Sequence, residues 1–229
     1  MKRFSALMIA TVLLLLVLAY GVGVMTRHQP LEALDESTLQ FVLDHRDPTR
    51  SGIVVLVTAL FGPLWVAVMT MTAAGVAFVA DRTVVRALTI VATVSAAGGI
   101  CEILKVVVHR ARPPAIDQIT TVETVNSYPS GHVTGIAALL LVLAVIITHT
   151  TLTRSIAIIS ALALTAVVAA TRLYMAAHWL TDVSAAVALA GAAALTVPVA
   201  VRGVVLRFPI AATGTARHRH PAQGRHESR

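Results

Sequence analysis

Long uncharged stretches alternate with short charged segments along most of this chain. Residues 5–25 contain no charged side chain, and neither do residues 51–80. A helix needs about 20 apolar residues to cross a bilayer, so each stretch is long enough to span one. Further apolar stretches follow at 87–108, 132–151, 155–171 and 183–201. The pattern predicts an all-α fold, an integral membrane bundle of six transmembrane helices.

The polar segments between these stretches predict the rest of the organisation. Residues 27–50 mix acidic, basic and apolar positions, which indicates either a short interfacial helix after the first span or a loop packed over the spans. Gly62-Pro63 marks either a kink in the second stretch or the point where a helix enters the membrane. Residues 109–128 form a polar loop. We expect one domain over 1–207 and a basic, disordered cytoplasmic tail over 208–229.

The first stretch also has the basic start of a signal peptide, because Lys2 and Arg3 precede it. However, it is long enough to span the bilayer, and no clear A-x-A cleavage site follows it. We therefore interpret it as an uncleaved first span.

The composition agrees with a membrane protein. Hydrophobic residues make up 57% of the chain and charged residues 13%, whereas about a quarter of a soluble domain is charged. The net charge is +7, but no basic stripe with interleaved aromatic residues is present, so we expect no nucleic-acid partner. The single cysteine, Cys101, excludes an intrachain disulfide and a multi-cysteine metal site, and we interpret it as a small core residue.

The charges of the loops predict the orientation in the membrane. With six spans, both termini lie on one side, and that side carries 11 basic and two acidic residues. The opposite side carries seven basic and nine acidic residues. Because basic residues accumulate on the cytoplasmic side, both termini are expected in the cytoplasm of a cell-membrane protein.

This topology gathers ionisable residues at the outer ends of spans three to six. They are Lys105, Arg110, Arg112, His132, Arg172, His178 and Asp182. Arginine forks match phosphate oxygens and lysine adds a point charge, so the set suits a multiply charged anion. Arg110 is better explained by snorkelling to the interface, whereas Arg172 is better explained by a function.

Two local patterns strengthen the anion site. The turn Pro129-Ser130-Gly131 leads into the fourth span and places His132 in its first turn. Ser130 is a favourable N-cap, and the free N–H groups at a helix start attract anions. His178 and Asp182 are four residues apart, which would place them on one face of a helix. A carboxylate beside one ring nitrogen fixes the histidine tautomer and makes the other nitrogen more nucleophilic.

Three spacings together resemble a known family. The first is Lys105, six residues, then Arg112-Pro113, and the second is Pro129-Ser130-Gly131-His132. The third is Thr171-Arg172, five residues, His178, three residues, Asp182. The pattern over 105–182 closely resembles the signature of the type 2 phosphatidic acid phosphatase (PAP2) superfamily. That superfamily includes membrane lipid phosphate phosphatases and soluble vanadium haloperoxidases. Thr171 stands where the pattern usually has serine, so the hydroxyl is kept.

The resemblance implies a role for each matching position. His178 would be the nucleophile that forms a phosphohistidine, Asp182 would orient it, and His132 would protonate the leaving oxygen. The phosphate-binding residues would be Lys105, Arg112, Ser130, Gly131 and Arg172. No metal and no cofactor are implied. For in-line attack, the chain has to turn between Arg172 and His178, although no glycine or proline lies there.

Three nearby residues fall outside the pattern. Glu102 lies three residues before Lys105, and we interpret it as a structural ion-pair partner, with lining of a cavity as the alternative. Tyr174 and Trp179 fit an interfacial aromatic belt, and contact with lipid is the alternative for either one.

We therefore expect a membrane phosphatase that acts on a lipid phosphate or diphosphate at the extracytoplasmic face. Its substrate would be of the undecaprenyl-diphosphate, phosphatidylglycerophosphate or phosphatidate type, which share the same head chemistry. A lipid phosphotransferase with the same pocket and a non-enzymatic lipid-binding or transport protein are the alternatives. Six apolar spans argue against a soluble haloperoxidase. The expected partners are the lipid substrate and the bilayer, and the sequence indicates no oligomeric state.

Overall fold

The structure is a computed structural model that describes residues 3–120 and 125–207. Within these ranges the chain is helical, apart from connecting loops and an isolated β-bridge between Ala111 and Asn126. The predicted all-α fold is confirmed. The helices are α1 (Arg3–Met25), α2 (Glu32–Asp44), η1 (Pro48–Arg50), α3 (Ser51–Leu60), α4 (Pro63–Asp81), α5 (Val84–Val108), η2 (Ala115–Asp117), α6 (Gly131–Ile147), α7 (Thr151–Tyr174) and α8 (Leu180–Arg207).

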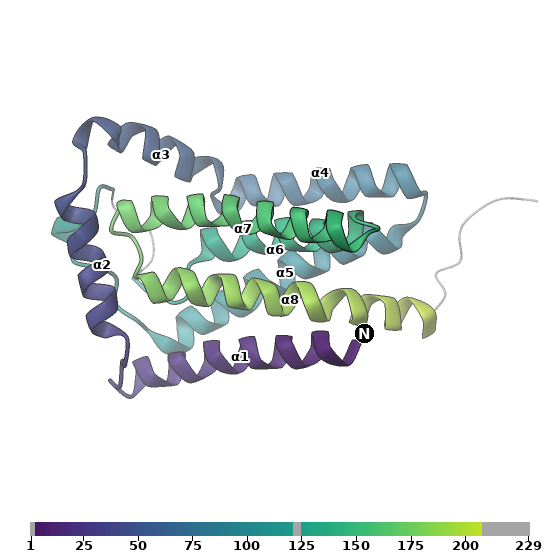
Figure 1. Ribbon diagram of the computed structural model, residues 1–229, viewed down its shortest axis with the longest axis horizontal. Coiled ribbons are helices and arrows are strands. Elements are labelled where there is room, and N and C mark those ends of the chain that lie inside the picture. The colour runs from purple at the N-terminus through teal and green to yellow at the C-terminus, as the bar shows by residue number, and fades with distance from the viewer. Residues whose placement is uncertain (1–2, 121–124, 208–229) are drawn as a thin grey trace, which may run out of the picture.

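The long helices form a bundle that α2 crosses at one end. Helices α1, α4, α5, α6, α7 and α8 run along the long axis of the molecule (Figure 1). We call the end where α1, α5 and α7 stop and α6 and α8 begin the α2 end. The start of α1 and the end of α8 lie together at the opposite end (Figure 1). This arrangement brings the loops after α5 and α7 next to the start of α6.

Small residues let the central helices approach closely. Helix α8 packs against α1, α5 and α6, while α6 also packs against α5 and α7. Their contact is built largely from alanines, including Ala137 and Ala138 of α6 and Ala190 and Ala193 of α8. Small side chains allow backbones to come close together in a membrane bundle, where packing rather than water exclusion holds helices together. The close contact fixes the positions of the starts of α6 and α8.

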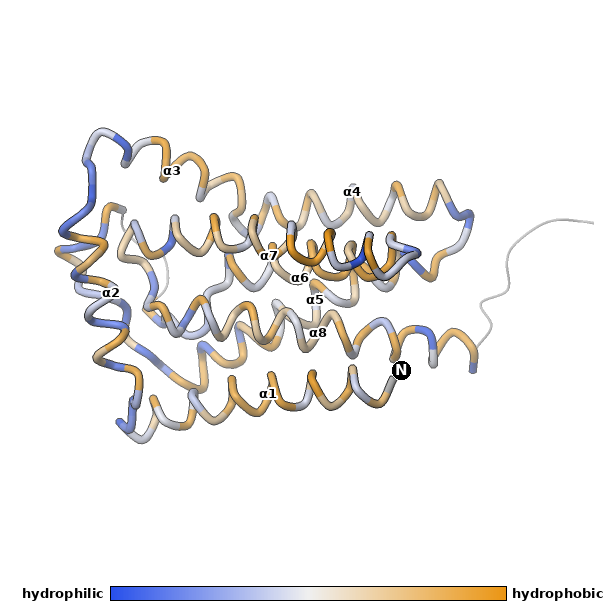
Figure 2. The backbone as a smooth tube through the Cα atoms, viewed as in Figure 1, coloured by the Kyte–Doolittle hydropathy of each residue, from blue (hydrophilic) through white to orange (hydrophobic). Residues whose placement is uncertain are grey.

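The surface of the bundle is suited to lipid. Five helices, α1, α4, α5, α7 and α8, are long and apolar enough to cross a bilayer, while α6 is a shorter apolar helix. Large apolar side chains face outward, among them Leu64, Met71 and Ile159. Figure 2 shows that hydrophobic residues dominate the helix shafts, with hydrophilic residues concentrated towards their ends. The chain is a multi-pass membrane protein. The count of six spans stays a prediction, because the 17 residues of α6 rise only about 26 Å.

The second apolar stretch is two helices rather than one kinked span. Helix α3 ends at Leu60, and α4 begins at Pro63. Proline has no N–H to donate, and it disfavours helical backbone at the residue before it. Accordingly Gly62 is extended, with φ −66° and ψ 165°. Of the two interpretations of Gly62-Pro63, the kink is therefore wrong, and a new helix starts there.

The polar segment after α1 contains the predicted short helix. Helix α2 lies against the ends of α7 and α8, and its buried residues are Asp35 and Leu39. Whether its exposed face meets the membrane surface stays a prediction. Lys2 and the tail 208–229 lie outside the described residues.

Candidate active site

The turn before α6 is held in the interior of the protein. Tyr128 is fully buried, and its hydroxyl donates to the carbonyl of Val17 in α1 at 2.7 Å. The N–H of Ser130 donates to the carbonyl of Asp182 at 3.2 Å, which fastens the start of α6 to the first turn of α8. Helix α6 then begins at Gly131, as the sequence indicated.

Ser130 differs from the expectation in one respect. It occupies the N-cap position of α6, but its side chain makes no capping hydrogen bond. Its hydroxyl oxygen is buried and has no partner among the described residues. The predicted side-chain cap is therefore wrong: the hydroxyl accepts no hydrogen bond from the N–H groups in the first turn of α6. A buried hydroxyl without a partner is costly, and a bound ligand could satisfy it.

Three cationic side chains come from different elements. Lys105, in the last turn of α5, pairs with Glu102 at 2.7 Å, so the predicted ion pair is present. Arg112 follows α5 and donates to the carbonyls of Ala177 at 2.5 Å and Asn126 at 3.2 Å. Arg172, in the last turn of α7, is buried, and its Nε has no partner among the described residues. A buried guanidinium with a donor to spare suits an anionic ligand.

The predicted turn between Arg172 and His178 is present. Helix α7 ends at Tyr174 and α8 starts at Leu180. Between them Ala176 has a φ of 49°, and the N–H of Ala177 donates back to the carbonyl of Arg172 at 3.0 Å. This is a helix C-terminus with a left-handed residue, formed here without glycine. The turn carries the chain from Arg172 to His178.

His178 and Asp182 are paired, but not on one helix face. His178 lies in the loop two residues before α8, whereas Asp182 is in the first turn of α8. The helical placement of His178 is therefore wrong. The pairing holds because the loop carries the ring back over the helix, where Nδ1 lies 3.4 Å from Oδ2 of Asp182. The same carboxylate oxygen accepts the N–H of Trp179 at 3.0 Å. Both side chains are almost wholly buried.

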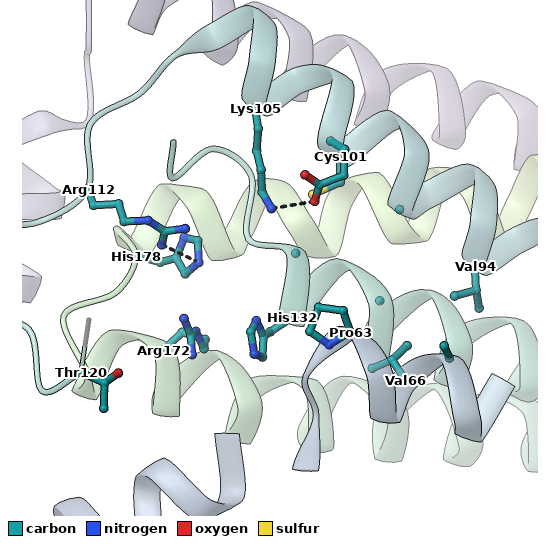
Figure 3. A pocket seen from close by; sticks show the side chains of 15 residues that line it. Pro63, Val66, Val94, Cys101, Lys105, Arg112, Thr120, His132, Arg172 and His178 are labelled. Atoms are coloured by element: carbon teal, nitrogen blue, oxygen red, sulfur yellow. Dashed lines mark hydrogen bonds and ion pairs between the residues drawn. The ribbon is translucent and has the colours of Figure 1, made fainter. Parts of the chain in front are cut away.

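The second ring nitrogen of His178 faces the cationic residues. Nη1 of Arg112 lies 3.2 Å from Nε2 of His178, and Figure 3 shows this contact beside Arg172 and His132. Since the guanidinium can only donate, Nε2 acts as the acceptor and the proton sits on Nδ1, towards Asp182. This is the tautomer that leaves the lone pair of Nε2 directed into the site.

Burial governs the charge of the loop residues at this site. Burial lowers the pKa of His178 to about 4, although hydrogen bonding and charge attraction from Asp182 oppose the change. Burial also lowers the pKa of Arg112, again against the attraction of Asp182. The ring of His178 is therefore neutral at neutral pH, so Nε2 keeps a lone pair.

These residues surround a cavity of about 540 Å³. Six of the eight predicted site residues line it, namely Lys105, Arg112, Gly131, His132, Arg172 and His178. Ser130 and Asp182 are not in its lining, and Asp182 lies behind His178. Away from the charged residues, the lining continues with apolar positions of α4, α5 and α6 (Figure 3). The cavity thus has a cationic part and an apolar part.

Two functional candidates were missed or undervalued from the sequence. Arg110 is not snorkelling to an interface: it is 6% exposed and forms salt bridges with Asp182 and Asp35, each at 2.6 Å. Burial alone would lower the pKa of Arg110, but the two carboxylates outweigh it and raise that pKa. Asp35 is one of the acidic residues of the segment 27–50 and was not among the predicted site residues. A signal was available, because Asp35 lies four residues before Leu39 on the apolar side of the helix.

The remaining residues near the site have structural contacts. Trp179 Nε1 donates to the carbonyl of Ala111 at 2.8 Å, and the ring lies over the guanidinium of Arg110. The hydroxyl of Tyr174 donates to the carbonyl of Asp47. Both aromatic side chains thus tie loops together at the α2 end. Cys101 is buried in the core, as predicted.

Comparison with known proteins identifies a solved structure with a similar fold and a family to which the sequence belongs. A crystal structure of a transmembrane PAP2-type phosphatidylglycerolphosphate phosphatase from Bacillus subtilis superposes with a TM-score of 0.71. The alignment covers 87% of this chain and 96% of that chain at 20% sequence identity, so the likeness concerns the fold. No curated protein sequence matches the chain. The family model described as the PAP2 superfamily matches residues 83–205, which is more than half of the chain and contains every predicted site residue. The chain therefore belongs to the PAP2 superfamily.

Proposed function

We propose that this protein is a phosphatase that hydrolyses a lipid phosphate or diphosphate through a phosphohistidine at His178. The observation that carries the proposal is the two-part cavity. Lys105, Arg112 and Arg172 surround one part, and apolar residues such as Val66 and Val94 line the other. A lipid phosphate has the same two parts, an anionic head and an apolar tail.

The cationic part suits a phosphoryl group. Three cations would neutralise its oxygens, and the N–H groups at the start of α6 would donate to them. The unpartnered hydroxyl of Ser130 and the unpartnered Nε of Arg172 would both gain an acceptor. Preorganised donors of this kind stabilise the charge that spreads over the equatorial oxygens during phosphoryl transfer.

The reaction would proceed in two steps. The lone pair of Nε2 of His178 attacks phosphorus, an N–P bond forms, and the P–O bond to the lipid breaks. His132, which lines the same cavity, protonates the leaving oxygen. Water then attacks the phosphohistidine, His132 takes a proton from it, and phosphate leaves as the N–P bond breaks. Asp182 holds the Nδ1 proton and stabilises the positive charge on the ring.

The tail would lie in the apolar part of the cavity, between α4, α5 and α6. Because this part lies among apolar helices, a substrate could reach the site sideways from the bilayer.

The loop charges support a site at the extracytoplasmic face of the cell membrane, with both termini in the cytoplasm. This orientation can be tested with single cysteines at Ile116 and Thr83, which are exposed and lie beyond opposite ends of α5. The natural cysteine, Cys101, is buried and should not react. A membrane-impermeant maleimide should label the first position and not the second in intact cells.

The decisive experiment is phosphate release by purified protein in detergent, with EDTA present. Phosphatidylglycerophosphate, phosphatidate and undecaprenyl diphosphate form the substrate panel. Phosphatidylglycerophosphate is tested before the others, because the structurally similar phosphatase is named for this lipid. We expect release by the wild type and loss in His178→Ala and His132→Ala, with the exposed His149→Ala as the control. An alkali-stable phosphoprotein should form in the wild type and be absent from His178→Ala. Wild-type release by His178→Ala would refute the proposal.

A further inference from the structure

A buried chain of charged groups links α2 to His178. Oδ2 of Asp35 lies 2.6 Å from Nη2 of Arg110, and Nη1 of Arg110 lies 2.6 Å from Oδ1 of Asp182. The other oxygen of Asp182 faces Nδ1 of His178 at 3.4 Å. All four side chains are at least nine-tenths buried. The guanidinium thus bridges two carboxylates, one of which holds the proposed nucleophile.

Asp35 also holds the beginning of α8. Its Oδ1 accepts the N–H of Thr181 at 2.9 Å, and its Oδ2 accepts the hydroxyl of Thr181 at 2.6 Å. That hydroxyl is also 2.6 Å from Nη1 of Arg110. Thr181 precedes Asp182 directly, so the contacts of Asp35 fix both the guanidinium and the backbone next to the catalytic carboxylate. Helix α2 therefore contacts the residues behind His178, although α2 lies outside residues 83–205, which match the family model.

The buried group of Asp35, Arg110 and Asp182 carries one net negative charge. Arg110 and Asp182 alone would form a neutral pair, which would do little for a positive charge on His178. Asp35 adds a second carboxylate and leaves the group with one net negative charge beside the ring. When Nε2 bonds to phosphorus while Nδ1 keeps its proton, the ring becomes positive. In a buried site, a net negative charge next to it stabilises that state.

We propose that Asp35 and Arg110 are positioning residues that orient Asp182 and keep the cluster behind His178 at one net negative charge. This inference rests on the proposed function, in which His178 is the nucleophile. It assigns to α2 a part in the chemistry, beyond covering the end of the bundle.

The first test is a charge-balance cycle in the purified full chain. Asp35→Asn leaves the cluster neutral, and we expect kcat to fall about 10-fold to 100-fold, with KM and inhibition by vanadate within about twofold of wild type. Arg110→Gln should also lower kcat. The double variant restores one net negative charge, so its kcat should equal or exceed that of Asp35→Asn. Glu36→Gln removes an exposed charge from the same helix and should match wild type.

A purely structural role predicts different results. The losses of the two single variants would then add in the double variant, or vanadate inhibition would weaken in parallel with kcat. Either result, or wild-type kcat in Asp35→Asn, would overturn the inference. A wild-type protein that releases no phosphate from the lipid panel is a separate outcome that counts against the proposed function.

The second test needs no turnover. Diethylpyrocarbonate modifies the free ring nitrogen of histidine, and peptide mass spectrometry gives the rate at each position. Because His178 and His132 line the same cavity, His132 serves as the internal reference. We expect Asp35→Asn to slow modification of His178 relative to His132 at least several-fold, and Glu36→Gln to leave the ratio unchanged. An unchanged ratio in Asp35→Asn would refute the positioning role even if the substrate were misassigned.

Discussion

The ammonium of Lys105 lies against the backbone of Gly131. A methyl group added at Gly131 would be 3.1 Å from Nζ of Lys105, closer than most carbon contacts in proteins. Glycine at this position therefore lets a charge from the end of α5 reach the first N–H groups of α6. The motif that begins at Lys105 and the motif 129–132 meet through this contact.

Gly131→Ala should push the ammonium of Lys105 away from the phosphate position. We expect KM and the vanadate inhibition constant to rise several-fold, while the thermal midpoint changes little because alanine suits a helix. Gly75→Ala is the matched control, since a methyl group there would meet nothing within 4 Å. Unchanged vanadate inhibition in Gly131→Ala would show that Lys105 adapts without cost.

Ser130→Ala should separate binding from stability. The buried hydroxyl of Ser130 has no partner among the described residues, so its removal should leave the free energy of unfolding unchanged or raise it by about 1 kcal/mol. Vanadate inhibition should nevertheless weaken about tenfold, because a donor to the anion is lost. Ser127→Ala provides the contrast: its hydroxyl donates to the carbonyl of Ala111 at 3.1 Å, and its removal should cost about 1 kcal/mol of stability. Inhibition and detergent-based unfolding measure the two effects.

The buried neutral ring of His178 predicts acid sensitivity of the fold. Its pKa is about 4 in the folded protein against 6.5 for an ordinary histidine, so between these values the unfolded chain binds a proton that the folded chain does not. Stability contributed by this group should fall as pH decreases from about 6.5 to about 4, by about 1.4 kcal/mol per pH unit at most. Thermal unfolding of His178→Gln should depend less steeply on pH than the wild type. Gly75→Ala, which changes no titratable group and meets nothing within 4 Å, should keep the wild-type slope.

Gly98 offers a test of the tail site. It lines the apolar part of the cavity, and a side chain there would extend into open space. Gly98→Leu should therefore reduce activity on dioleoyl phosphatidate more than on dihexanoyl phosphatidate, at least several-fold in the ratio of kcat/KM values. Gly99→Leu is the neighbouring control, because Gly99 is exposed and is not among the residues that line the cavity. An equal loss on both substrates would place the tail elsewhere.

The all-helical fold and most helix positions followed from the sequence because a bilayer imposes a simple rule. Runs of apolar residues long enough to span it become helices, which satisfy their own backbone hydrogen bonds. The break at Gly62-Pro63 was visible too, but the direction taken by α3 depends on its packing against α7. The meeting of Lys105, Arg112, His132, Arg172 and His178 was expected from motif spacing and loop charges, which place helix ends on one side.

What the sequence by itself determined was thus the apolar helices, their breaks and the residue types gathered at one end. Tertiary structure alone decided how those residues are joined. His178 reaches Asp182 from the loop before α8, and Ser130 stands at the N-cap of α6 without a side-chain cap while its N–H bonds to the carbonyl of Asp182 in α8. Asp35 and Arg110 lie 75 residues apart in sequence, and their contact exists only because α2 folds across the end of the bundle. Such long-range pairing of charges leaves no periodic pattern in the sequence, since it depends on where separate elements meet.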